Sequence, residues 1–336
     1  MATNEIPSPA RLFDAFTAYQ RTAALKAAIE LDLFSAIGAR GATAAEAAER
    51  TSASQRGVRI LCDRLAVDGF LTKTGDRYGL ATEAALFLDR SSPAYLGSAI
   101  TFIASPAVKA GFDLLTDAVR RGGTAVSEAG TMAPEHPMWV EFARAMAPMA
   151  AMSAEMLNLA LGDLPIRGSV LDVAAGHGLY GITIARHHPE ARIVAQDWAS
   201  VLAVARENAE RADVAARWSA LPGSAFDVDL GRDHALVLLT NFLHHFDPPT
   251  NESLLRRVHA SLAPGGRVAA VEFVPNEDRV SPPEAAAFSL TMLAGTAAGD
   301  AYTFSEYERM FSAVGFSRIA LAELAPTPQR VVIAVR

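Results

Sequence analysis

Apolar and polar positions follow their most regular pattern in the segment GSVLDVAAGHGLYGITIARHHPEARIVAQD, residues 168–197. Val170, Leu171 and Val173 form a short apolar run that is typical of a buried parallel strand. Residues 179–187 carry apolar side chains at helical spacing, and a second apolar run occupies 193–195. The pattern therefore predicts a βαβ unit with a turn of small residues, 174–178, between the first strand and the helix.

This turn has the residue types of a ligand site. Gly176 and Gly178 let a ligand approach the backbone closely, and the helix that follows begins with free N–H groups. Asp197 ends the second strand, where a carboxylate can accept two hydrogen bonds from a ribose diol. Asp172 precedes the turn, where a carboxylate repels a pyrophosphate and attracts an ammonium group. These charges favour S-adenosylmethionine, whose methionine end is a zwitterion, over a dinucleotide.

Two other interpretations of the unit remain open. Residues 176–181 spell G-x-G-x-x-G, the dinucleotide fingerprint, although it begins four residues after Asp172. The segment also fits a plain βαβ unit that binds no ligand.

The second half of the chain supplies further strands. An apolar strand at 235–239 is followed by polar and aromatic residues at 240–247, and another strand is expected at 267–274. Functional groups of open α/β sheets gather beyond the carboxyl ends of the strands, so residues 240–247 are site candidates. Two final strands, at 319–324 and 330–335, predict an antiparallel hairpin on an otherwise parallel sheet. The fold class is therefore α/β.

The first ninety residues predict helices followed by a small hairpin. The expected elements are helices near 12–20, 23–33 and 54–67, a short helix opened by the capping-box signature at Thr43, and strands at 69–71 and 78–80. Helices followed by a two-stranded wing indicate a winged helix-turn-helix.

A winged helix raises the alternative of a DNA-binding regulator. The helix expected at 54–67 carries Arg56, Arg59 and Arg64, which could contact phosphates and base edges. Asp63 and Asp68 dilute this charge. The whole chain has 30 Lys and Arg against 37 Asp and Glu, a net charge of −7. An acidic chain is a poor candidate for nucleic-acid binding, so we expect no nucleic-acid partner.

Composition narrows the class further. The chain of 336 residues contains one cysteine, Cys62, which excludes a disulfide framework and a cysteine-based zinc site. Cys62 stands at helical spacing with Val58 and Leu65, so we expect it in a core. There is no signal-peptide pattern and no run of eighteen apolar residues. We therefore expect a cytoplasmic protein with no membrane partner.

The motif LDVAAGHG, followed by AQD at the matching interval, resembles a known family. The chain is similar to class I S-adenosylmethionine-dependent O-methyltransferases of small molecules, of the plant caffeate and bacterial polyketide type. Their motif is V-D-V-G-G-G-x-G, in which Ala174 and Ala175 here replace two glycines. Alanine is tolerated there if its φ is negative.

The resemblance covers nearly the whole chain and implies its organisation. Residues 1–95 would form a winged-helix dimerisation domain, and 96–162 a helical linker with substrate-lining helices. Residues 163–336 would form a Rossmann-like, seven-stranded catalytic domain that binds S-adenosylmethionine. The resemblance also implies a homodimer in which the partner subunit helps to close the active site.

The same resemblance implies a set of cofactor contacts. These are Asp172, Ala174, Gly176, Gly178, Asp197, Ser224, Ala225, Phe226 and Asn241. In the family an Asp-Met pair contacts the adenine, and Ser224 and Ala225 take its place here. Packing against the adenine would then come from Phe226 or Trp198.

The stretch Leu243-His244-His245-Phe246 matches the family's Leu-His-Asp-Trp, whose histidine takes the proton from the acceptor hydroxyl. An imidazole with a pKa near 6.5 suits that task, so His244 is the expected base. A metal held by both histidines and an acid is an alternative that adjacent histidines support weakly. The family's orienting glutamate is replaced by Ala301, so the orienting acid is either missing or supplied by Asp300, one residue away.

Substrate contacts are expected from two helices and from the loop of the base. They are Phe142, Met146, Met149, His245 and Met292. The stripe of methionines around Met146 equally fits an ordinary core, since methionine fills irregular gaps.

The predicted function is methyl transfer from S-adenosylmethionine to a hydroxyl of a small aromatic or polyketide-like acceptor of secondary metabolism. Methyl transfer to carbon or nitrogen is an alternative, as is a repurposed hydroxylase, decarboxylase or cyclase that keeps the cofactor.

Overall fold

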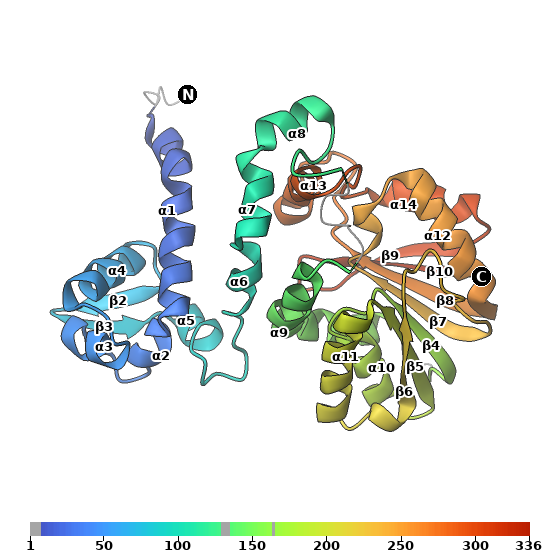
Figure 1. Cartoon of the computed structure of the whole chain (residues 1–336), viewed down its shortest axis with the longest axis horizontal. Coiled ribbons are helices and arrows are strands. Elements are labelled where there is room, and N and C mark those ends of the chain that lie inside the picture. Colours follow the sequence, from blue (N-terminus) through green and yellow to red (C-terminus); the bar gives the residue numbers. More distant parts are fainter. Residues whose placement is uncertain (1–7, 129–134, 163–164) are drawn as a thin grey trace, which may run out of the picture. The chain divides into compact units, whose positions relative to one another are not determined.

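The computed structural model describes residues 8–128, 135–162 and 165–336. The chain divides into two compact units, one up to Ser105 and one from Pro106 onward (Figure 1).

The first unit combines helices with a small antiparallel sheet. Its helices are α1 (Ala10–Glu30), α2 (Leu33–Ile37), α3 (Ala44–Arg50), α4 (Gln55–Val67), α5 (Thr82–Phe87) and α6 (Ala99–Ile103). Its strands are β1 (Ala42–Thr43), β2 (Leu71–Thr74) and β3 (Arg77–Leu80), in the order β1-β3-β2. The capping box at Thr43 is present, and Ser54 caps α4 through the N–H of Gly57. The helices and two-stranded wing expected from the sequence are therefore found.

Helix α1 corrects one expectation. Separate helices were expected at 12–20 and 23–33, whereas a single helix runs from Ala10 to Glu30. Neither glycine nor proline lies within it, so nothing in the sequence breaks it. It ends where Asp32 takes a left-handed conformation, with φ of 54°. The helix keeps large apolar side chains exposed: Leu12, Phe13, Phe16 and Tyr19.

The core of the first unit packs Leu33, Phe34, Ile37, Leu65 and the thiol of Cys62. Burial raises the pKa of Cys62 to about 11, so this thiol is unreactive and structural, as predicted.

Two of the three arginines of α4, Arg59 and Arg64, are held by acids of the same unit. Arg59 pairs with Asp63 at 2.9 Å, and Arg64 pairs with Asp68 at 2.7 Å. Lys73 of the wing also contacts Asp63, at 2.5 Å. These ion pairs offset the positive charge that a DNA-reading helix needs.

The second unit is built on a seven-stranded sheet. Its strands are β4 (Gly168–Val173), β5 (Ala191–Asp197), β6 (Trp218–Pro222), β7 (His234–Thr240), β8 (Leu262–Glu272), β9 (Ser317–Glu323) and β10 (Arg330–Val335). They lie in the order β6-β5-β4-β7-β8-β10-β9. The first five in this order are parallel, whereas β10 is antiparallel to both neighbours. The predicted terminal hairpin and the α/β fold class are confirmed.

Helices cover both faces of this sheet (Figure 1). The helices of this unit are α7 (Pro106–Asp113), α8 (Leu115–Arg121), α9 (Met138–Ala160), α10 (Leu179–His187), α11 (Ala199–Arg211), α12 (Pro248–Ser261), α13 (Pro283–Gly295) and α14 (Phe304–Ala313), of which α9 to α12 and α14 pack on the sheet. Short 3₁₀ turns, η2 and η3, occupy Ala215–Arg217 and Leu243–His245. Helices α9 and α10 contribute to the core on one face, and α12 and α14 to the core on the other.

Strand β7 shows why residues 235–239 are apolar without interruption. Leu236 and Leu238 face one core, whereas Val237 and Leu239 face the other. A strand buried on both faces is apolar at every position. The order of the sheet reverses at β4, between β5 and β7, and the carboxyl ends of these strands form the crevice where such folds bind ligands.

Candidate active site

The turn after β4 contains a strained residue. Ala174 has φ of 50°, so the condition under which alanine is tolerated here, a negative φ, is not met. The left-handed conformation costs an alanine roughly 1–2 kcal/mol. Gly176 and Gly178 also have positive φ, at 57° and 73°. A Cβ on Gly178 would come within 2.9 Å of the Cβ of Ala205, so this glycine is needed for close packing on α11.

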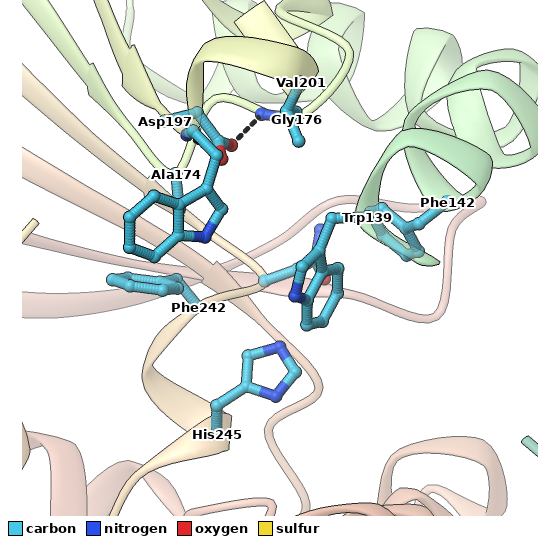
Figure 2. A pocket seen from close by; sticks show the side chains of 10 residues that line it. Trp139, Phe142, Ala174, Gly176, Asp197, Val201, Phe242 and His245 are labelled. Carbon is cyan, nitrogen blue, oxygen red and sulfur yellow. Dashed lines mark hydrogen bonds between the residues drawn. The ribbon is translucent and has the colours of Figure 1, made fainter. Parts of the chain in front are cut away.

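Asp197, at the end of β5, is fixed by the backbone around it. Its Oδ2 accepts a hydrogen bond from the N–H of Gly176 at 2.9 Å, and its Oδ1 accepts one from Trp198 at 2.7 Å. Figure 2 shows the first of these bonds joining the strand end to the glycine turn. Burial raises the pKa of Asp197 to about 6 although both bonds lower it.

Asp172 is the most buried acid of the turn, with 1 % of its surface exposed. Its Oδ2 accepts a bond from the N–H of Gly181 at 3.1 Å, and its Oδ1 has no partner within the described ranges. Burial raises its pKa to about 7, and the charge of Asp197 adds to the shift. A buried, half-satisfied carboxyl next to a second acid is suited to receive a cation.

A cleft of about 450 Å³, which opens to solvent, begins at this turn (Figure 2). Its lining residues are Trp139, Phe142, Ala174, Gly176, Asp197, Trp198, Val201, Asn241, Phe242 and His245. Seven of them were predicted as cofactor or substrate contacts: Phe142, Ala174, Gly176, Asp197, Trp198, Asn241 and His245. The turn, Asp197 and the loop after β7 therefore meet in one place. All belong to the second unit.

Trp139, Val201 and Phe242 line the cleft and were missed. Trp139 stands three residues before Phe142 on α9, and the two rings are in contact with centroids 5.7 Å apart. Two aromatic residues at helical spacing were the available signal.

Several predicted contacts lie outside the residues that line the cleft. The methyl group of Ala225 faces the core, with 4 % of the residue exposed, contrary to the expectation that it meets the cofactor. The hydroxyl of Ser224 accepts a hydrogen bond from the N–H of Phe226 and so stabilises the turn in which it lies. Phe226 packs its ring against Phe246, with centroids 5.0 Å apart.

The predicted substrate contacts on α9 and α13 differ in burial. Met146 is half-buried, whereas Met149 is 40 % exposed. Met292 is buried on α13, one turn after Phe288, whose ring lies 4.8 Å from that of His244. The faces of α9 and α13 that carry these residues remain the predicted substrate contacts.

His244 is held by an acid that was not predicted. Its Nδ1 lies 2.5 Å from Oε2 of Glu272, the last residue of β8. The other oxygen of Glu272 accepts the N–H groups of Phe242 at 3.0 Å and Leu243 at 2.8 Å. Glu272 has no exposed surface, and His244 is 3 % exposed. A single buried carboxylate therefore fixes both the backbone of η3 and the ring of the histidine.

Asp300, the expected orienting acid, does not do this. One of its oxygens pairs with Arg279 at 3.2 Å, and the other accepts the N–H of Ala301 at 2.8 Å. Its side chain is 38 % exposed. The prediction is wrong because the sheet brings Glu272, at the end of β8, next to the loop after β7. A lone charged residue in the apolar strand VAAVEFV was the signal for it.

The ring of His245 stands beside that of His244, with centroids 4.3 Å apart. The ring of Trp139 lies 5.5 Å away, and Phe242 and Phe246 complete an aromatic surround. Burial lowers the pKa of His245 well below its ordinary range, and His244 lowers it further. His245 is therefore neutral at physiological pH.

The metal alternative finds no support. Nowhere in residues 8–128, 135–162 and 165–336 do three His, Cys, Asp or Glu side chains gather as a metal site needs. Likewise, none of the helices described here is both long and apolar enough to cross a membrane. The cytoplasmic location stays a prediction.

Comparisons with known proteins agree with this architecture. A sequence model of the O-methyltransferase domain matches residues 114–317, and one of the O-methyltransferase dimerisation domain matches residues 13–90. The chain is 29 % identical to 3-hydroxy-5-methyl-1-naphthoate 3-O-methyltransferase of Streptomyces sahachiroi, over 94 % of this chain and 92 % of that protein. It is 27 % identical to the tetracenomycin polyketide synthesis 8-O-methyl transferase TcmO of Streptomyces glaucescens, over 94 % and 93 %.

Solved structures show the same fold. A candidate O-methyltransferase from Nostoc punctiforme is 51 % identical, with a TM-score of 0.94 over 99 % of this chain and 100 % of that one. Human N-acetylserotonin methyltransferase, solved in complex with SAM, is 22 % identical, with a TM-score of 0.85 over 100 % and 99 %. The domain match covers more than half of the sequence, and the chain therefore belongs to the O-methyltransferase family.

Proposed function

We propose that the protein transfers a methyl group from S-adenosylmethionine to a hydroxyl of a small aromatic or polyketide-like acceptor of secondary metabolism. The observation that carries the proposal is the buried His244–Glu272 pair, beside a cleft that begins at the glycine turn. The relatives from the two Streptomyces species support the acceptor class, since their names specify a naphthoate and a tetracenomycin polyketide.

The residues of the turn fit the cofactor. Asp172 has a free, buried carboxyl oxygen for the ammonium group at the methionine end of S-adenosylmethionine. Asp197 is placed for the ribose hydroxyls. Gly176 leaves room for close approach, and Trp198 offers an indole face at the same wall of the cleft. When bound, S-adenosylmethionine supplies a methyl group that is already strongly electrophilic.

His244 acts as the general base. Glu272 accepts a hydrogen bond from Nδ1–H, so the ring carries its lone pair on Nε2 and can take the proton of an acceptor hydroxyl. The carboxylate then stabilises the imidazolium that forms, as the aspartate of a serine-protease triad does. The aromatic wall of Trp139, Phe142 and Phe242 orients a flat acceptor and excludes water.

The first unit joins two copies of the chain into a homodimer. Leu12, Phe13 and Phe16 on α1 are each more than half exposed in the single chain. An apolar stripe of this kind on a dimerisation domain is suited to pack against its copy.

Calorimetric titration with S-adenosylmethionine, S-adenosylhomocysteine and NAD tests the cofactor. We expect both sulfur compounds to bind and NAD not to bind, and Asp197→Ala to weaken the binding. Binding of NAD alone would contradict this assignment and indicate a dinucleotide-binding protein such as a dehydrogenase.

Methyl transfer to phenolic acceptors, followed as a mass gain of one methyl group, tests the reaction. His244→Ala should abolish transfer to oxygen while leaving the affinity for S-adenosylhomocysteine unchanged. His187→Ala, on the exposed side of α10, is the matched control. Unchanged turnover in His244→Ala would refute the base and favour the non-oxygen alternatives.

A further inference from the structure

His245 lines the cleft, yet neither of its ring nitrogens makes a hydrogen bond to any part of the chain that the structure describes. Its Nδ1 is buried against protein, whereas Nε2 is not among the buried unpartnered atoms. Figure 2 shows the ring directed from its loop into the space below Phe242 and Trp139. Nε2 therefore faces the cleft.

The surroundings decide which nitrogen of His245 carries the proton. A neutral imidazole has one N–H donor and one bare acceptor nitrogen. A buried N–H without an acceptor is rarer in proteins than an under-satisfied acceptor, and such an orphan costs about 1–3 kcal/mol. Because Nδ1 is buried with no acceptor, the proton belongs on Nε2. His245 thus presents a neutral N–H donor to the cleft.

Its position relates this donor to the base. The rings of His244 and His245 lie 4.3 Å apart and are inclined by 56°. Two oxygens that are joined by an internal hydrogen bond on an aromatic ring system lie about 2.7 Å apart. This separation is shorter than the 4.3 Å between the two ring centroids, so neighbouring imidazoles can be assigned one oxygen each.

We propose that His245 donates a hydrogen bond from Nε2–H to an oxygen beside the hydroxyl that is methylated, so that the enzyme selects aromatic hydroxyls next to a carbonyl group. This inference rests on the proposed function, with His244 as the base. The acceptor class is then an ortho- or peri-hydroxy carbonyl compound, such as a hydroxyquinone.

The two histidines divide the work on such a substrate. The hydroxyl proton of a hydroxy-carbonyl compound is held internally by the carbonyl oxygen, which makes it harder for a base to remove. The N–H of His245 occupies a lone pair of that carbonyl and weakens its hold on the proton. His244 then accepts the proton on its own Nε2. His245 touches the substrate without exchanging a proton.

The test compares 1-hydroxyanthraquinone with 2-hydroxyanthraquinone. Both are flat and have the same atoms, but only the first carries its hydroxyl beside a carbonyl. We expect the wild type to prefer the first isomer in kcat/KM. In His245→Phe, which keeps a ring but loses both nitrogens, the ratio of the two values should fall about tenfold, the equivalent of one hydrogen bond. Intrinsic differences between the isomers cancel in this comparison.

Two further variants separate donation from packing. His245→Gln places an amide N–H near the position of Nε2 and should restore most of the preference. His245→Glu has the same length but only acceptor oxygens, so it should lose the preference as the phenylalanine variant does. His187→Phe, at an exposed position paired with Glu155, should behave as the wild type.

A binding readout makes the result independent of turnover. The visible absorption of each isomer, titrated with the S-adenosylhomocysteine complex, reports its affinity. Tighter binding of the 1-isomer to the wild type, and loss of that difference in His245→Phe, support the inference. Equal affinity for both isomers, or a ratio unchanged in His245→Phe, overturns it. Failure of the wild type to bind S-adenosylhomocysteine instead overturns the proposed function.

Discussion

Replacing Glu272 by glutamine removes the charge that supports the base while keeping the shape of the side chain. The amide oxygen can still accept the N–H groups of Phe242 and Leu243, so the backbone of η3 should hold. The amide NH₂ group, however, then faces Nδ1 of His244 and needs a lone pair there. The proton of the imidazole moves to Nε2, and the base can no longer accept the hydroxyl proton.

The magnitude follows from the burial of the pair. The side chains of His244 and Glu272 are 4 % and 0 % exposed, so water screens them little. Two unit charges with centres about 4 Å apart interact by roughly 4 kcal/mol at an effective dielectric constant of about 20. Because about 1.4 kcal/mol corresponds to a tenfold change in rate, losing the carboxylate should lower kcat about a thousandfold.

The assay is the initial rate of methyl transfer at saturating S-adenosylmethionine. Calorimetry with S-adenosylhomocysteine should show unchanged cofactor affinity, and a thermal melt should show that the variant folds. Asp300→Asn is the matched control, because this acid pairs with Arg279 away from the base. We expect its kcat to stay within about twofold, as for most surface changes. An E272Q rate within a few-fold of the wild type, or a larger loss in D300N, would refute the assignment.

Three further predictions concern pH, assembly and strain. Affinity for S-adenosylmethionine should rise between about pH 5 and 8, because Asp197 and Asp172, with pKa values near 6 and 7, must be ionised to receive it. Because the pKa values of these carboxyls are raised, the folded state keeps protons that the unfolded state has already lost. The melting temperature of the free protein should therefore fall as pH rises from about 4 to 7. A flat affinity profile and a flat melting profile would contradict this prediction. Phe16→Lys on α1 should shift the protein from dimer to monomer in light scattering, whereas a dimer of unchanged strength would exclude α1 from the interface. Ala174→Gly should raise the free energy of unfolding by about 1 kcal/mol in urea titrations, because glycine accepts a φ of 50° without strain; equal or lower stability would show that the turn is not strained.

The sequence predicted the parts of the site that depend on local pattern. The βαβ unit was readable because a buried strand, a helix and a turn of small residues each have their own spacing. Asp197 was a candidate because it ends a recognisable strand, and His244 because it follows β7 in a stretch that resembles the family's Leu-His-Asp-Trp. The terminal hairpin was readable from two apolar runs joined by a short polar link.

The partner of the base was not readable in the same way. Glu272 lies 28 residues from His244, and only the pairing of β7 with β8 makes them neighbours. Asp300 was chosen because it lies one residue from the expected position, but distance along the chain says little about orientation in a loop. The positive φ of Ala174 was also hidden, because the hydrogen bonds that impose it come from β5, through Gln196 and Asp197.

The carboxylate of Glu272 binds both the main chain of η3 and the ring of His244, the proposed base. The amide protons of Phe242 and Leu243 bond to the same group that orients His244, so their exchange with deuterium reports how firmly the base is supported. A distant substitution that increases the local motion of Phe242 and Leu243 should also let the imidazole of His244 rotate. Loss of rate without loss of cofactor would then be visible first as faster exchange at these two amides.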